Sequence, residues 1–261
     1  MAYSVVTIAG ALVYGSDTWF RAVDPIARVF RYYGHVAPLD TDAKGRLVVR
    51  LPGTKLADST LLDGIDEVAF VIALLWATTF DGVVTTPLWR SLAIEVVGAG
   101  VPPALVYPGA LGLGFAVFLG LYLGATRLVR RTADTFIGAD ELARRFAPPL
   151  LAIAAGYHVA HFLGYFLSLS PQLVTTVSTP FTAVEPQVLV LPDWFGVVGI
   201  AAILLGHLLA IWAAHAAALS LFPSRLQAIR SQYPFVGVMI CYTMTSLWIV
   251  TRPDTTPPFL L

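Results

Sequence analysis

Long apolar stretches separated by short polar connections run through most of the chain. The five longest cover about residues 65–88, 102–126, 148–169, 194–222 and 234–251. A helix rises about 1.5 Å per residue, so these stretches approach or exceed the hydrocarbon thickness of a membrane, about 30 Å. An apolar run at residues 2–14 covers only about 20 Å and is too short to span. The pattern predicts an all-α membrane protein, a polytopic bundle of about five to six transmembrane helices.

The stretch after the first apolar run has a different period. Between Trp19 and Tyr33 apolar residues recur at helical spacing, with three arginines between them. We expect an amphipathic interfacial helix, capped by Asp17, that lies on the membrane surface. A polar connection follows, and it contains a candidate hairpin around residues 42–50.

Three regions follow from this pattern. Residues 1–64 hold the partial apolar segment, the interfacial helix and a polar loop. Residues 65–251 form the five-span bundle, and residues 252–261 form a C-terminal tail.

Composition supports lipid as the solvent. Hydrophobic residues make up 57% of the chain and charged residues 12%, which is too little charge to cover a water-facing surface. The formal net charge is zero, so no excess of basic residues points to nucleic acid. Cys241 is the one cysteine, which excludes a thiol-rich metal site. The strong excess of arginine over lysine is typical of a prokaryotic protein with a GC-rich gene.

The arginines also predict an orientation. They crowd residues 127–145 and 225–230, whereas residues 170–193 contain neither lysine nor arginine. By the positive-inside rule, these arginine-rich connections and residues 15–66 face the cytoplasm. The sequence therefore predicts a multi-pass protein of the cell membrane, with the lipid bilayer as its first partner.

Several ionisable residues fall inside the predicted spans. Counting from the cytoplasmic end of each span at about 1.5 Å per residue, Asp81 lies about 22 Å deep, His161 about 20 Å and His207 about 22 Å. These three groups, from three helices, are therefore expected at one level. His158 precedes His161 by three residues and shares its helix face. His215 lies about 10 Å deep, in a lower layer.

Ionisable groups in hydrocarbon cost at least about 2.5–3.5 kcal/mol, so they usually have a partner or a function. Imidazole and carboxylate ligands suit a divalent metal such as Zn, Fe or Cu, which would turn a bound water into a nucleophile. We predict Asp81, His161 and His207 as metal ligands. Asp81 and His158 are also the predicted catalytic pair, with His158 tuning the metal or carrying protons.

Other interpretations stay open. The same groups could hydrogen-bond across helices and stabilise the packing. They could also form a proton path, because histidine titrates near neutral pH. Bis-histidine haem would need His158 or His161 opposite His207, and nothing else favours haem or a quinone. The second span also carries five glycines, a common close-packing pattern: Gly109, Gly112, Gly114, Gly120 and Gly124.

Several strings resemble a multi-pass membrane family of actinobacteria and haloarchaea, known as fenitrothion hydrolase. They are Phe80-Asp-Gly82, Ala160-His161, Gly206-His207 and Ser231-Gln-Tyr-Pro234, and the resemblance runs over most of the chain. It implies a membrane-embedded hydrolase of a lipophilic, organophosphate-like ester.

Family members carry further apolar segments ahead of the point where this chain begins. The resemblance therefore also implies a missing N-terminal part, or a partner membrane subunit that supplies those helices. The alternative function is a non-catalytic membrane subunit or a proton-coupled transporter that uses the buried histidine and aspartate groups.

Overall fold

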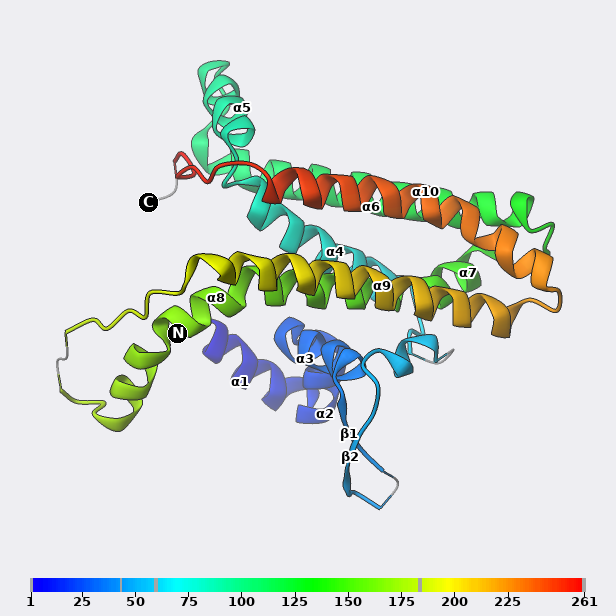
Figure 1. The fold of residues 1–261 in the computed structure, drawn as a ribbon, viewed down its shortest axis with the longest axis horizontal. Coiled ribbons are helices and arrows are strands. Elements are labelled where there is room, and N and C mark those ends of the chain that lie inside the picture. Colours follow the sequence, from blue (N-terminus) through cyan, green and yellow to red (C-terminus); the bar gives the residue numbers. More distant parts are fainter. Residues whose placement is uncertain (1, 43, 59–60, 183–184, 260–261) are drawn as a thin grey trace. The chain divides into compact units, whose positions relative to one another are not determined.

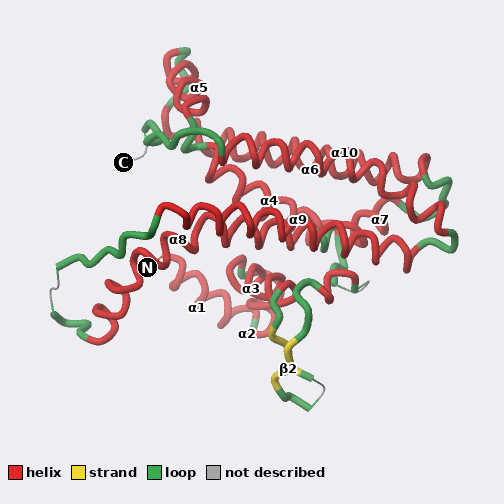
Figure 2. Tube along the Cα trace, viewed as in Figure 1, coloured by secondary structure: helices red, strands yellow, loops and turns green. Residues whose placement is uncertain are grey.

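The computed structural model describes residues 2–42, 44–58, 61–182 and 185–259. The chain divides into two compact units between Leu56 and Ala57, close to the boundary at residue 64 that hydropathy suggests. Figures 1 and 2 show the elements of both units.

The smaller unit holds short helices followed by a hairpin. Its elements are α1 (Ala2–Tyr14), α2 (Ser16–Thr18), a π-helical turn (Trp19–Val23), α3 (Pro25–Val36), β1 (Leu39–Thr41) and β2 (Leu47–Val49). The two strands pair antiparallel, with Asp40 opposite Val48, as expected of a hairpin. A 3-10 turn, Thr54–Ala57, leads on to the larger unit.

The expected amphipathic helix is broken just before Pro25. Proline suits the first turn of a helix, where its missing N–H leaves no bond unmade. Asp24 caps this new start, since its Oδ1 accepts a hydrogen bond from the N–H of Ala27 at 2.7 Å. Its Oδ2 accepts one from the hydroxyl of Tyr3 at 2.6 Å, tying α1 to α3. The cap of the main amphipathic helix is therefore Asp24, not Asp17.

Asp24→Asn is expected to loosen the first turn of α3. The hydrogen bond from Tyr3 is the main reason that the pKa of Asp24 lies below its ordinary value of 3.8, followed by the bond from Ala27. A lowered pKa means that the ionised carboxylate stabilises the folded state above about pH 4, and that this contribution is lost as the pH falls through the folded pKa. Hydrogen exchange of peptides from α3 at pH 7 measures the effect. Asp17→Asn is the matched control, and equal exchange in the two variants would contradict the assignment.

The larger unit is a helical bundle. Its elements are α4 (Ile65–Val83), α5 (Pro87–Gly98), α6 (Pro103–Thr132), α7 (Ala139–Phe146), α8 (Leu150–Ser178), a 3-10 turn (Asp193–Phe195), α9 (Gly196–Leu221) and α10 (Arg225–Val250). Within the described ranges, four helical segments are long and apolar enough to cross a membrane. A fifth span is counted if α4 and α5, bent by 90° at their connection, are one broken crossing. The predicted all-α membrane fold is confirmed.

Helices α8 and α9 pack closely through glycines and run side by side (Figure 1). A Cβ atom on Gly156 would lie 2.5 Å from the carbonyl oxygen of Ala202, and one on Gly206 would lie 2.6 Å from that of Ala152. Small residues at such positions let helix backbones approach.

The glycines of α6 were expected to form such a face. Only Gly114 does, against the indole of Trp76, whereas no described residue lies where a Cβ on the others would stand.

Aromatic side chains join the other helices to α6. The indole N–H of Trp76 on α4 donates to the carbonyl of Leu111 at 2.8 Å. The hydroxyl of Tyr242 on α10 donates to the carbonyl of Phe118 at 2.9 Å, and the two rings stack at 4.3 Å. Each bond satisfies the polar tip of an aromatic residue where no water is available.

The bundle has two unlike ends. The arginine-rich end comprises α7 and the connection between α9 and α10. The opposite end comprises the bend between α4 and α5, the start of α9 and the segment after α10.

That last segment folds back onto the α4–α5 connection. The N–H of Thr255 donates to the carbonyl of Thr85 at 2.7 Å. Arg90 and Tyr107 donate to the carbonyls of Thr256 and Pro258, at 3.0 and 2.6 Å. Residues 252–258 therefore pack against the bundle, whereas the sequence predicts only a tail.

Candidate functional site

Asp81 and His161 meet at the end of the bundle opposite the arginines. Oδ2 of Asp81 lies 3.0 Å from Nε2 of His161, and the two side chains are 49% and 36% exposed. They come from the last turn of α4 and the middle of α8. Two of the three residues predicted from the sequence as metal ligands are thus in direct contact.

Hydrogen bonds from two threonines end α4 just after Asp81. The hydroxyls of Thr85 and Thr86 donate to the carbonyls of Gly82 and Val83, which ends the helix in a tight turn. Thr86 then caps α5 by accepting from the N–H of Trp89. The chain thus bends by 90° between Val83 and Pro87, starting within one helical turn after Asp81.

Gly82, in the last turn of α4, is closely packed by two side chains. A Cβ atom there would lie 2.9 Å from the hydroxyl of Tyr157 and 2.8 Å from Cγ2 of Ile249. Glycine therefore lets α8 and α10 approach α4 beside the carboxylate. This packing accounts for the Asp81-Gly82 pair that interrupts the first span.

A cavity of about 240 Å³ adjoins the pair. Its lining is mixed, and the apolar residues include Ile200, Ile203 and Ile249. Its polar lining residues are Thr85, Tyr157, His161, Arg252 and Asp254. Such a cavity can hold a small amphiphilic group against the imidazole of His161.

The protonation of His161 follows from its partner. An ionised carboxylate only accepts hydrogen bonds. Nε2 of His161 is therefore the protonated nitrogen, and it donates a hydrogen bond to Asp81. In the neutral ring, Nδ1 then keeps its lone pair and can accept a proton. The carboxylate fixes the tautomer, as the aspartate does in a Ser-His-Asp triad.

His207 does not lie with this pair. Gly199 of α9 is level with Ala160 of α8, because a Cβ on Gly199 would be 3.4 Å from the carbonyl oxygen of Ala160. His207 follows eight residues later, about 12 Å along the axis. No group of three or more His, Cys, Asp or Glu residues that could hold a metal occurs in the described part of the chain.

The offset of His207 arises from the register of the two helices. The predicted depths assume that both spans begin at the same cytoplasmic level. Contacts of Gly206 with Ala152, two residues into α8, show instead that α9 extends well past the start of α8. His207 therefore lies near the beginning of α8, whereas His161 lies eleven residues into it.

His207 is tied to its own helix. It is 8% exposed, and its Nδ1 donates to the carbonyl of Ile203 at 2.8 Å. Its Nε2 is buried and has no hydrogen-bond partner among the described residues.

The two remaining histidines of the bundle have hydrogen-bonding partners away from the Asp81–His161 pair. His158 donates from Nδ1 to the carbonyl of Ala154 at 3.2 Å, and its ring contacts Phe162. Nδ1 of His215 lies 3.1 Å from Nε2 of Gln232. His158 lies one turn from His161, as its spacing predicts, while its Nδ1 is engaged by the backbone.

Sequence reasoning missed several residues of the cavity. Tyr157 lies four residues before His161, so helical spacing alone places it on the same face. Arg252 and Asp254 directly follow a predicted span, where charge usually marks only the membrane boundary.

The chain matches no family model, no curated protein and no solved structure.

Proposed function

We propose that the chain is a membrane-embedded hydrolase of small lipophilic esters, with His161 as the general base. The observation that carries the proposal is the Asp81–His161 contact beside a cavity with both polar and apolar lining residues. In this reaction Nδ1 of His161 takes a proton from a water molecule, and the water oxygen attacks the ester centre. The imidazolium then gives that proton to the leaving alkoxide.

The other cavity residues have matching roles. Asp81 orients the ring and stabilises the imidazolium. Arg252 also lines the cavity, and we propose that its positive charge stabilises the negative charge that develops on the ester oxygen. The apolar lining residues from α9 and α10 suit the hydrocarbon part of the substrate.

A divalent metal does not enter this scheme. Two of the ligands predicted for it, Asp81 and His161, are together, and His207 is about 12 Å away along α9. Metal analysis of purified protein tests the metal proposal separately. If about one equivalent of Zn, Fe or Cu is lost in Asp81→Asn and kept in His207→Gln, the protein holds a metal at Asp81 and His161 without His207 as a ligand.

Proton transfer is the second candidate, and one observation favours it. The histidines lie at successive depths from one end of the bundle to the other: His161, His158, His207 and His215. His207 lies about 12 Å along the axis from His161, with His158 between them, and about 12 Å from His215. Water would have to bridge these gaps.

Liposomes that contain the protein and a pH-sensitive dye separate the two functions. Proton flux that His207→Gln abolishes, with no ester hydrolysis, would replace the first proposal. Constant copurification of a second membrane polypeptide would favour a subunit role.

The proposed location is the cell membrane, with the arginine-rich end in the cytoplasm. The Asp81–His161 cavity would then open toward the outer side.

A further inference from the structure

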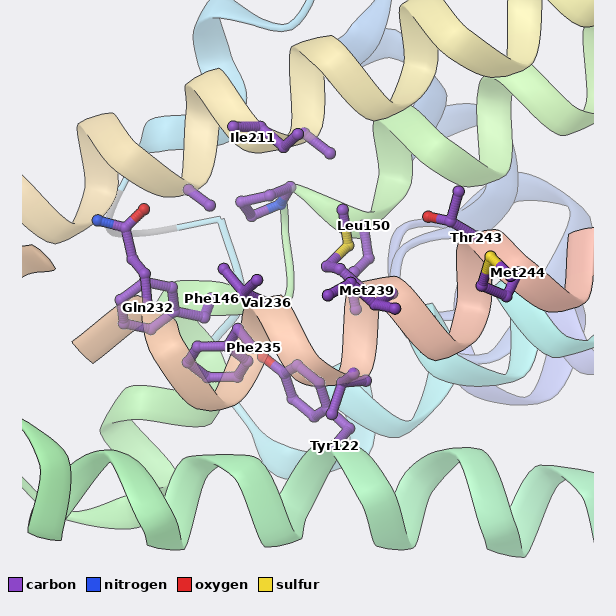
Figure 3. A pocket seen from close by; sticks show the side chains of 15 residues that line it. Tyr122, Phe146, Leu150, Ile211, Gln232, Phe235, Val236, Met239, Thr243 and Met244 are labelled. Carbon is purple, nitrogen blue, oxygen red and sulfur yellow. The ribbon is translucent and has the colours of Figure 1, made fainter. Parts of the chain in front are cut away.

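A second cavity, of about 300 Å³, lies in the other half of the bundle, between α8, α9 and α10. Figure 3 shows Ile211 of α9 on one side of it and Met239 and Thr243 of α10 on the other. Phe146, Leu150 and Tyr122 complete much of the wall. Nearly all of this lining is apolar, so the cavity suits hydrocarbon. It does not include Asp81 or His161.

The cavity is accessible from the lipid-facing side of the bundle. Ile240 and Met244, which line it, are 57% and 64% exposed, as expected of side chains that meet acyl chains. Ligand pockets in proteins usually measure about 300–1,000 Å³, so this volume fits one narrow chain better than a broad ring system.

One end of the cavity is polar. Gln232 lines it, and its amide nitrogen lies 3.1 Å from Nδ1 of His215 and donates to the carbonyl of Ala228 at 2.9 Å. Figure 3 places Gln232 apart from Thr243 and Met244, toward the opposite end of the lining. Gln232 is also the end nearer the start of α10, which is the arginine-rich end. Thr243 is a further polar residue at the other end, and most of the wall between it and Gln232 is apolar, which suits a ligand with a polar head at Gln232 and an apolar chain.

Charge at that end favours an anionic head. Arg225 precedes Gln232 by seven residues, two helical turns on the same face of α10 and about 10 Å closer to the membrane boundary. Arg225 and Arg230 are exposed. Arginine pairs with phosphate through parallel hydrogen bonds, and basic residues at a membrane boundary attract anionic lipids.

We propose that this cavity binds one acyl chain of an anionic phospholipid, with the phosphate held at Arg225 and the chain running past Gln232 toward Met244. The site is distinct from the proposed ester site and does not depend on it. Its occupant belongs to the membrane leaflet at the arginine-rich end.

Photolabelling of the full chain in nanodiscs tests this site. The probes are phosphatidylglycerol and phosphatidylcholine with the same diazirine-bearing acyl chain. We expect phosphatidylglycerol to label peptides containing Leu150 and Met239 about fivefold more than phosphatidylcholine, the factor that one basic contact supplies. Arg225→Gln should remove this preference. Equal labelling by the two lipids in the wild-type protein would overturn the role of charge.

A filled cavity provides the second comparison. Ala214→Leu adds three carbons to the lining, so labelling of the same peptides should fall at least severalfold. Ala201→Leu, on an exposed position of the same helix, is the matched control and should leave labelling unchanged. Unchanged labelling in Ala214→Leu would show that the chain lies outside the cavity and overturn the proposal. A photoreactive residue at position 240 that crosslinks two protein copies would show that a second copy covers the cavity, which would also overturn the proposal.

Discussion

Replacing His161 with glutamine is expected to slow ester hydrolysis by about 10²–10⁴-fold, the range that general-base catalysis supplies. Glutamine can still hydrogen-bond to Asp81, whose Oδ2 lies 3.0 Å from the imidazole, but it cannot take a proton from water. The measurement is release of p-nitrophenol from p-nitrophenyl acetate, butyrate and octanoate by protein in liposomes.

His215→Gln is the matched control for that loss. It makes the same chemical change in the same bundle, at a residue that contacts Gln232 in the half of α9 nearer the arginine-rich end. We expect it to hydrolyse the three esters at nearly the wild-type rate. Equal losses in the two variants would mean that the substitutions act through the fold, and His161 would lose its assigned role.

Replacing Gly206 with alanine is expected to destabilise the bundle by about 1–3 kcal/mol, the usual cost of overpacking. The added Cβ would lie 2.6 Å from the carbonyl oxygen of Ala152 and 3.3 Å from Cα of Gly156, so a backbone must move. The α8–α9 contact is the most extensive helix pair in the bundle, which leaves little room for that movement. Unfolding of purified protein in mixed micelles of increasing SDS content measures the change.

Gly237→Ala provides the comparison for Gly206→Ala. This glycine lies within α10, and among the described residues no neighbouring atom lies within 4 Å of the position that a Cβ would take. Alanine should leave the unfolding midpoint unchanged or raise it slightly, because alanine favours helix over glycine. The same midpoint for both variants would show that α8 and α9 are not packed as closely as their glycines indicate.

The spans could be predicted from the sequence because lipid imposes a simple length rule. A helix in hydrocarbon must satisfy its own backbone, so apolar length alone locates α6, α8, α9 and α10. Local chemistry was harder to predict at Asp24 and Pro25, where a proline and a better cap override the amphipathic period that begins at Trp19. Apolar periodicity does not register such a break.

Asp81 and His161 were predicted to lie at one level, and they do, but His207 was wrongly placed at the same level. Depth counted along one helix is accurate only if neighbouring helices start at the same height. That height depends on the glycine contacts between α8 and α9, which are a property of the pair and not of either sequence segment. For the same reason the sequence of α6 alone could not show which of its glycines contact another helix; among the described residues only Gly114 does.

The cavity beside His161 was also beyond prediction. It requires the sharp bend after Gly82 and the return of Thr255 to the carbonyl of Thr85. The bend is made by local hydrogen bonds from Thr85 and Thr86, whereas the return of Thr255 joins segments 170 residues apart in the sequence. A short polar segment after the last span gives no sign of such a bond.

A double-mutant cycle on Asp81 and His161 tests the central claim most directly. The rates of p-nitrophenyl ester hydrolysis are measured for the wild-type protein, Asp81→Asn, His161→Gln and the double variant. Because the aspartate acts only through the histidine, we expect the double variant to be no slower than His161→Gln alone. Losses that multiply, or a wild-type protein that hydrolyses none of the three esters, would contradict the assignment of this pair as a catalytic site.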